Sequence, residues 1–153
     1  MREILFRGKR KGNGKWVKGS YCQKKTAHYE GREIVEDVKH LIITSMTDCR
    51  YLYAEVDPET VCQYTGLTDR NGRKIFEGDT VRDILNDSVV GTVRYGEYRN
   101  IFNEDEHGGH AGFYVEWKNE QELLRKDLVY WAKNSKFTGN IFDNPELVNQ
   151  EEK

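Results

Sequence analysis

The sequence predicts a mainly β protein with a small β-barrel-like core, an N-terminal β-hairpin region and one short helix. Three observations support this fold class. Short segments rich in valine, isoleucine, tyrosine and threonine recur along the 153 residues. Turn residues separate them every ten to fifteen positions, a spacing typical of sandwiches and barrels. Helical periodicity is confined to one stretch.

Residues 1–57 are expected to form the N-terminal β-hairpin region. A glycine-rich basic tip, residues 8–14, joins the first two strands, because its glycines allow positive φ. A second hairpin follows, rich in β-branched and aromatic residues. Residues 23–36 between these hairpins are polar, and their pattern is ambiguous. The strand candidates are residues 3–7, 15–19, 38–44 and 50–56.

Residues 58–148 are expected to form the β-rich core, followed by a disordered tail at residues 149–153. Asn71-Gly72 predicts a type I′ hairpin turn, because both central residues of that turn need positive φ. A glycine-aspartate turn, a strand and a glycine-containing return strand then resemble a small SH3-like barrel, an analogy that carries no function. The further strand candidates are residues 64–69, 73–76, 80–85, 89–95, 113–117 and 137–142.

Residues 120–132 are the helix candidate, since four large apolar side chains recur there on roughly one face. Residues 96–112 read as a long polar loop. The four apolar residues are Leu123, Leu124, Leu128 and Trp131.

Composition excludes several classes of protein. No apolar run approaches the ~20 residues needed to span a bilayer, and no signal peptide is recognised, so we expect a cytoplasmic protein without a membrane partner. The three cysteines fit neither a disulfide framework nor a C-x-x-C zinc site, and buried free thiols are expected. No phosphate-binding glycine motif is present, and no cofactor is predicted.

Charge is distributed unevenly along the chain. Residues 1–25 carry nine basic groups and one acidic group, which leaves −10 for the other 128 residues. Such asymmetry indicates either a face that binds a polyanion or a match between a basic and an acidic element, within one chain or between subunits.

The basic tip is the candidate nucleic-acid site. Cations on a flexible hairpin can follow a phosphate backbone, and a neighbouring aromatic ring can stack on a base. The alternative is a solvated loop at a sheet edge, where lysine also blocks aggregation. The residues concerned are Lys9, Arg10, Lys11, Lys15 and Trp16.

A second cluster has the residue types that bind metals. His107 and His110 lie three residues apart, beside the carboxylates of Glu104 and Glu106. Two imidazoles with one or two carboxylates can hold zinc. The flanking glycines argue against a rigid site, and a solvated loop is the simpler interpretation.

Three segments together resemble the YopX family of phage and prophage proteins: residues 1–7 with 16–21, residues 60–81, and residues 139–147. The resemblance implies a small, β-rich cytoplasmic protein encoded by a bacterial virus or its integrated remnant. It implies no established activity and no catalytic residues.

The leading functional hypothesis is therefore a non-enzymatic phage accessory protein that binds another protein or its own copies. The first alternative is a nucleic-acid-binding protein using the basic tip, and the second is a metal-dependent hydrolase using the histidine cluster. No small-molecule ligand is predicted.

Overall fold

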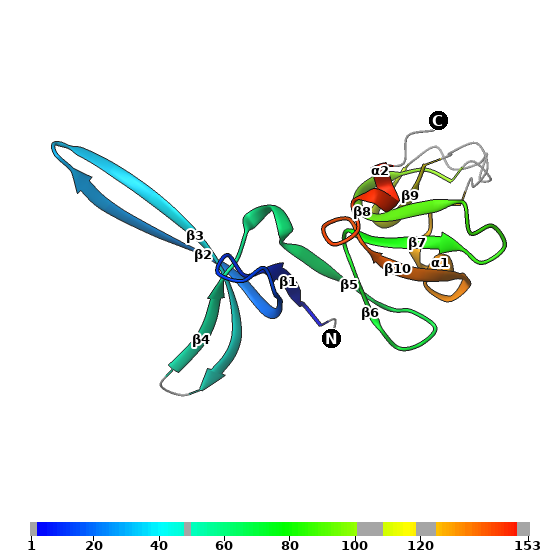
Figure 1. The fold of residues 1–153 in the computed structure, drawn as a ribbon, viewed down its shortest axis with the longest axis horizontal. Helices are drawn as coiled ribbons and strands as arrows, with labels where there is room; N and C mark the ends of the chain where they lie inside the picture. Colours follow the sequence, from blue (N-terminus) through cyan, green and yellow to red (C-terminus); the bar gives the residue numbers. More distant parts are fainter. Residues whose placement is uncertain (1–2, 48–49, 101–108, 119–124, 150–153) are drawn as a thin grey trace. The chain divides into compact units, whose positions relative to one another are not determined.

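A computed structural model describes residues 3–47, 50–100, 109–118 and 125–149. The chain is mainly β with two antiparallel sheets, which confirms the predicted fold class (Figure 1). It divides into unit 1, residues 1–64, and unit 2, residues 65–153. The strands are β1 Phe6–Lys9, β2 Trp16–Glu30, β3 Glu33–Thr47, β4 Arg50–Glu55, β5 Cys62–Thr68, β6 Lys74–Phe76, β7 Asp79–Asp83, β8 Val90–Tyr98, β9 His110–Trp117 and β10 Ser135–Asn140, and the helices are η1 Pro58–Thr60, α1 Leu128–Asn134 and α2 Glu146–Asn149.

Unit 1 is built on the antiparallel order β4-β3-β2-β1, with the start of β5 beside β1. Strands β2 and β3 approach closely at the base of their hairpin. A Cβ on Gly19 would therefore overlap the carbonyl group of Ile43. One small apolar cluster holds this region together. It consists of Val17, Ile42, Ala54 and Val56, with Phe6 and Val61 packed against it.

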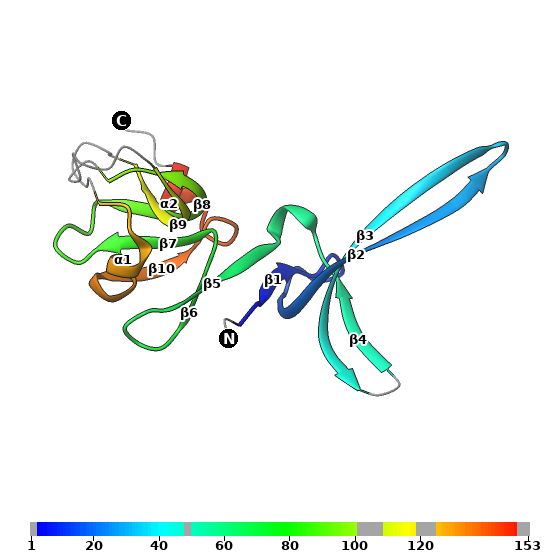
Figure 2. The same ribbon diagram turned by 180° about the vertical axis from the view of Figure 1, so that it is seen from behind.

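The β2–β3 hairpin extends well past this cluster (Figure 2). Its ladder runs without a register shift from Ser20↔Ile43 to Glu30↔Glu33. Gly31 begins the turn with a φ of 67°, which glycine adopts without steric cost. The sequence left this segment ambiguous because a strand exposed on both faces lacks the alternation that burial imposes.

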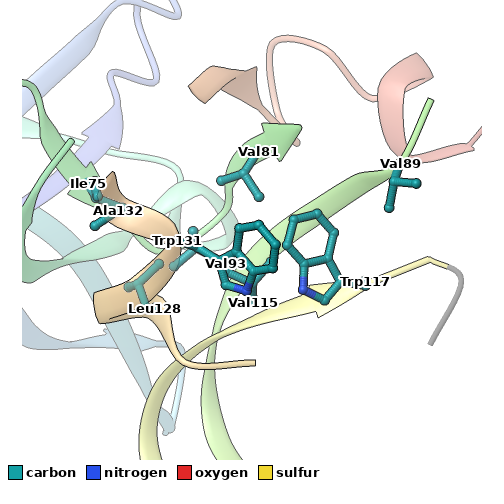
Figure 3. Close-up of a cluster of buried hydrophobic side chains, with 9 residues drawn as sticks. All are labelled: Ile75, Val81, Val89, Val93, Val115, Trp117, Leu128, Trp131 and Ala132. Carbon is teal, nitrogen blue, oxygen red and sulfur yellow. The ribbon is translucent and has the colours of Figure 1, made fainter. Parts of the chain in front are cut away.

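Unit 2 contains the four-stranded antiparallel order β10-β7-β8-β9. Strands β10 and β9 form its two edges, and no closed barrel is defined among the described residues. Strand and helix side chains share one core (Figure 3). The buried members are Ile75, Val81, Val89, Val93, Val115, Trp117, Leu128, Trp131 and Ala132.

The predicted hairpin at Asn71-Gly72 joins β5 to β6, but its predicted turn type is wrong. Only Gly72 has a positive φ, of 79°, whereas type I′ requires one at both central residues. Gly72 N donates to Asp69 O, and the Asp69 carboxylate accepts from the amides of Asn71 and Arg73. This side-chain acceptor favours a longer turn than the two-residue signal suggests.

The predicted helix is displaced along the chain. Helix α1 begins at Leu128 and ends at Asn134, beyond the predicted end at residue 132. Residues 119–124 lie outside the described residues, and Asp127 is extended and bridges Tyr114 on β9. The expectation that Leu128 and Trp131 face the core is confirmed. No described helix is long and apolar enough to cross a bilayer.

Candidate functional site

The basic tip brings cations onto an aromatic ring. Trp16 lies opposite Lys9 in the β1–β2 ladder. The Arg7 guanidinium carbon lies 4.8 Å and the Lys9 ammonium 5.5 Å from the centroid of the Trp16 ring. Both distances are within the range of cation–π attraction, so Lys9 and Trp16 form one local cluster, together with Arg7.

Another cation of the tip is matched inside unit 1. Lys11 Nζ lies 3.0 Å from Glu55 on β4, and Lys39 Nζ lies 4.0 Å from the same carboxylate. The hydrogen bond from Lys11, with the charges of Lys11 and Lys39, lowers the pKa of Glu55. Part of the basic charge therefore neutralises an acid of its own unit, one of the arrangements that the sequence allowed.

The remaining tip residues do not join the Trp16 cluster. Arg10 forms a backbone bridge with Val56. The amide of Lys15 donates to the side chain of Asn13 and shapes the turn.

The predicted metal cluster is described only in part. His107, Glu104 and Glu106 lie outside the described residues. His110 begins β9, and its ring centroid lies 5.4 Å from that of Tyr98. Within the described ranges, no three His, Cys, Asp or Glu side chains could share a metal ion.

Unit 2 contains a pocket of about 750 Å³ between β8, β9 and the start of α1. A volume of 300–1,000 Å³ is typical of small-molecule sites. Aromatic and aliphatic side chains make up most of its wall, and a few polar groups converge in it. The lining residues are Thr65, Leu67, Tyr98, Asn100, His110, Phe113, Arg125, Asp127, Leu128, Val129 and Tyr130.

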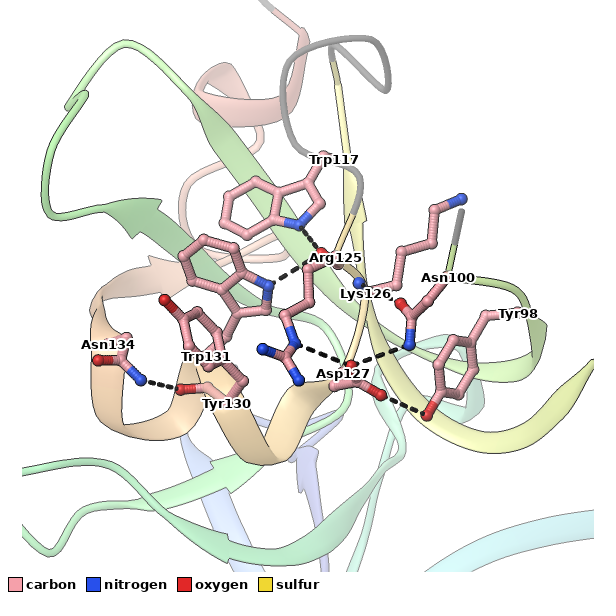
Figure 4. Close-up of polar contacts among 9 residues, drawn as sticks. All are labelled: Tyr98, Asn100, Trp117, Arg125, Lys126, Asp127, Tyr130, Trp131 and Asn134. Carbon is pink, nitrogen blue, oxygen red and sulfur yellow. Dashed lines mark hydrogen bonds and ion pairs between the residues drawn. The ribbon is translucent and has the colours of Figure 1, made fainter. Parts of the chain in front are cut away.

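Asp127 organises the polar side of this pocket (Figure 4). Its carboxylate accepts hydrogen bonds from Asn100 Nδ2 at 2.9 Å, Arg125 Nε at 3.0 Å and Tyr98 Oη at 3.4 Å. Burial alone would raise the pKa of Asp127, but these hydrogen bonds and the Arg125 charge together lower it. Asp127 is therefore held as a carboxylate that orients its three donors.

The backbone of Arg125 is fixed from the core side. Its carbonyl oxygen accepts hydrogen bonds from the indole nitrogens of Trp117, at 3.1 Å, and Trp131, at 2.9 Å. The two indole rings meet edge to face with centroids 4.7 Å apart. The pocket wall is thus attached directly to the core of unit 2.

Sequence reasoning missed Tyr98, Asn100, Arg125 and Asp127. Tyr98 ends β8 and Asn100 follows it, whereas Arg125 and Asp127 precede α1, and no local motif links segments so far apart. In the predicted helix at residues 120–132, Arg125 would lie away from the apolar face, where an arginine needs no explanation.

The second candidate site is the outer part of the β2–β3 hairpin, residues 24–39, called the arm below. Each of these residues is exposed except Val35, which is half-buried. Strand β1 pairs with β2 only at Trp16–Gly19, and β4 pairs with β3 only at Leu41–Thr47. Among the described residues, the two arm strands thus have only each other as ladder partners.

One face of the arm is apolar. Residues paired across an antiparallel ladder share a face, and faces alternate along each strand. The pairs Tyr29↔Ile34, Ala27↔Glu36 and Lys25↔Val38 therefore lie on one face. By the same alternation, this apolar face continues the face that buries Val17 and Ile42 in unit 1. Tyr29, Ile34 and Val38 are 76%, 63% and 43% exposed.

Comparison with known families gives one match. The family model described as YopX protein matches residues 5–149, nearly the whole chain, which confirms the resemblance noted in the sequence. No curated protein matches the chain.

Proposed function

The chain belongs to the YopX family, and we propose that it acts by binding, through association of two copies along the apolar faces of their arms. The observation that carries this proposal is the exposure of Tyr29, Ile34 and Val38 on one face of a hairpin outside any core cluster. The setting is the one that the family resemblance implies, a protein of phage or prophage origin in the cytoplasm of the bacterial host.

The physics of hairpins supports a partner for the arm. An isolated two-stranded hairpin is at best marginally stable in water, and a third strand or a covering surface stabilises it. The arm also has open edges and an exposed apolar stripe, which are typical of surfaces that are covered in an assembly. A partner packed on the apolar face would provide the missing cover.

The charge pattern of the face supports a second copy as that partner. The apolar face carries one basic residue, Lys25 near the root, and one acidic residue, Glu36 nearer the tip. Suppose that two arms pack face to face and antiparallel, with the two-fold axis between the Lys25↔Val38 and Ala27↔Glu36 pairs. Lys25 of each copy then lies diagonally opposite Glu36 of the other. Parallel packing would instead place each Lys25 diagonally opposite the other Lys25, and each Glu36 diagonally opposite the other Glu36. The face is therefore complementary to itself under a two-fold rotation, the symmetry of most homodimers.

The first test is the oligomeric state of the full chain by sedimentation across protein concentration. Each copy contributes six residues to this face. A standard interface has roughly 20–30 residues on each side, so we expect a weak dimer. Tyr29→Ser with Ile34→Ser should remove it. Tyr51→Ser is the matched control, because Tyr51 is 62% exposed on the other hairpin, β3–β4. A monomer at every concentration, or loss of the dimer only in Tyr51→Ser, would refute the proposal.

Charge exchange tests the antiparallel arrangement. Lys25→Glu and Glu36→Lys should each abolish self-association, because each places like charges together twice in the dimer. A mixture of the two variants should associate as a heterodimer, since both contacts are then complementary. The double variant should dimerise with itself. Failure of the mixture to associate, with a wild-type dimer present, would reject this arrangement but not self-association.

Nucleic-acid binding is the second candidate, supported by the Arg7 and Lys9 cations over the Trp16 ring. Fluorescence anisotropy with single- and double-stranded DNA and RNA at two salt concentrations tests it. Lys9→Glu should weaken binding and reduce its salt dependence, because phosphate contacts release counterions. Lys11→Glu is a weaker probe, since Lys11 already pairs with Glu55. Unchanged affinity in Lys9→Glu would eliminate this site.

A further inference from the structure

We propose that the pocket of unit 2 binds a small molecule in which an oxyanion is attached to a planar ring, with Arg125 holding the oxyanion. This site is independent of the arm and of self-association. Binding alone is proposed, and no covalent bond of the ligand forms or breaks.

The first argument is that Arg125 is fixed at three points. Its carbonyl oxygen is held by the two indole nitrogens of Trp117 and Trp131. Its Nε donates to Asp127, and its guanidinium carbon lies 4.5 Å from the centroid of the Tyr130 ring (Figure 4). A half-exposed arginine ordinarily retains much rotational freedom, and holding it still costs conformational entropy.

The second argument concerns the N–H groups that remain. A guanidinium has five N–H donors, and the bond to Asp127 uses only the one on Nε. Neither terminal Nη group donates a hydrogen bond to a described residue. The fork of N–H groups fits the paired oxygens of a carboxylate or phosphate. Because the side chain is already ordered, an oxyanion binds it with less loss of entropy than it would a mobile arginine.

The third argument is the composition of the wall. The rings of Tyr98, His110, Phe113 and Tyr130 line the same pocket, with Leu67 among the aliphatic residues. Flat aromatic walls favour a planar ring, which they contact by stacking or by edges. The guanidinium and the rings lie in one pocket, so a ligand that joins an anion to a ring can use both.

The fourth argument is local charge. Arg125 and Asp127 neutralise each other, so an added anion needs further positive charge nearby. A smaller hollow of about 360 Å³ shares Tyr98 with the pocket, and Arg99 and Lys126 line it together with Glu97. Among the described residues that line this hollow, two are cationic and one is a carboxylate, which favours an anionic ligand over a neutral one.

The test is calorimetric or NMR titration of the full-length protein with defined probes. Adenosine 5′-monophosphate and uridine 5′-monophosphate represent a ring with a phosphate, and indole-3-acetate represents a ring with a carboxylate. Adenosine, uridine and indole supply the ring halves separately, and inorganic phosphate and acetate supply the anionic halves. We expect one of the two ring-anion classes to bind at least about tenfold more tightly than its halves. Which class binds identifies the oxyanion.

Arg125→Lys tests the role of the guanidinium, since it keeps the charge but removes the fork. It should weaken binding about tenfold, the loss expected for a bidentate contact. Arg94→Lys is the matched control, because Arg94 pairs with Glu116 in the same unit and does not line the pocket. Circular dichroism confirms that both variants fold. An absence of binding by every ring-anion probe up to ~10 mM, or equal affinity in Arg125→Lys and Arg94→Lys, would overturn the proposal.

Discussion

The arm of unit 1 and the pocket wall of unit 2 are positioned by different physics. The arm is held by its own backbone ladder, with almost every side chain exposed. The pocket wall is fixed by buried indoles below it and by a network around Asp127. The arm, for which we propose a partner, has no cover on its apolar face among the described residues. The wall of the pocket, for which we propose a ligand, is already held by hydrogen bonds to the core.

Hydrogen exchange should reveal the largest difference between the two regions. In dilute monomer, amides of the arm open locally, whereas those of β7 and β8 need global unfolding. We expect protection at least about a thousandfold greater in β7 and β8 than at Lys24–Glu30, measured residue by residue by NMR. Raising the protein concentration should protect the arm selectively. If the arm amides of the dilute monomer exchange as slowly as those of β8, the predicted difference between the two regions is wrong.

The next largest effect should follow truncation of a core indole. Trp131→Ala removes a buried ring from the unit 2 core and one of the two hydrogen bonds to Arg125 O, so it should cost about 3–5 kcal/mol of unfolding free energy. Trp131→Phe keeps most of the bulk and should cost less. Denaturant unfolding measures both. Tyr29→Ser in the arm should stay within about 0.5 kcal/mol in the monomer, and a larger cost there would show that the arm is packed.

A third prediction concerns the base of the β2–β3 hairpin, where the strands leave the apolar cluster of unit 1. Gly19→Ala should destabilise by about 1–3 kcal/mol, because a Cβ there overlaps the carbonyl group of Ile43 and forces β2 from β3. Gly12→Ala in the basic tip is the control, since a Cβ at Gly12 meets nothing within 4 Å. Thermal unfolding of both variants checks this expectation. Equal melting temperatures would mean that the root relaxes without cost.

The sequence predicted the elements of unit 2 better than it predicted either candidate site. Hairpins and core strands have local signals: Asn71-Gly72 marked a real turn, and Leu128 and Trp131 marked the buried side of α1. Even there, the side-chain acceptor of Asp69 selected another turn type. Local composition gave the right connection but not its geometry.

The sites were harder to predict because both depend on residue pairings that no local motif specifies. The arm needs the register of β2 against β3, which places Lys25 beside Val38 and Glu36 beside Ala27. Because these two charged residues lie on the apolar face, the alternation along each strand is too irregular to identify the strands from sequence. The pocket needs Asn100 to reach Asp127, a contact between two polar residues that look solvated when read singly.

The smallest predicted effect distinguishes two carboxylates of unit 2 by their response to pH. The pKa of Asp127 is lowered in the folded protein, so its carboxylate contributes stability that is present above the ordinary aspartate pKa of 3.8 and is lost as pH falls through the folded value. Asp127→Asn should therefore cost about 1 kcal/mol at neutral pH, and this difference should shrink below pH ~4. Burial raises the pKa of Glu77, which gives the opposite sign: Glu77→Gln should stabilise slightly at neutral pH and lose that advantage below the ordinary value of 4.5. Urea unfolding at a series of pH values measures both. If the unfolding free energies of wild type and Asp127→Asn change with pH in parallel, the three donors stabilise the Asp127 carboxylate no better than water does. The hydrogen bond from Arg125 Nε to Asp127 would then be too weak to hold the guanidinium in place for a ligand.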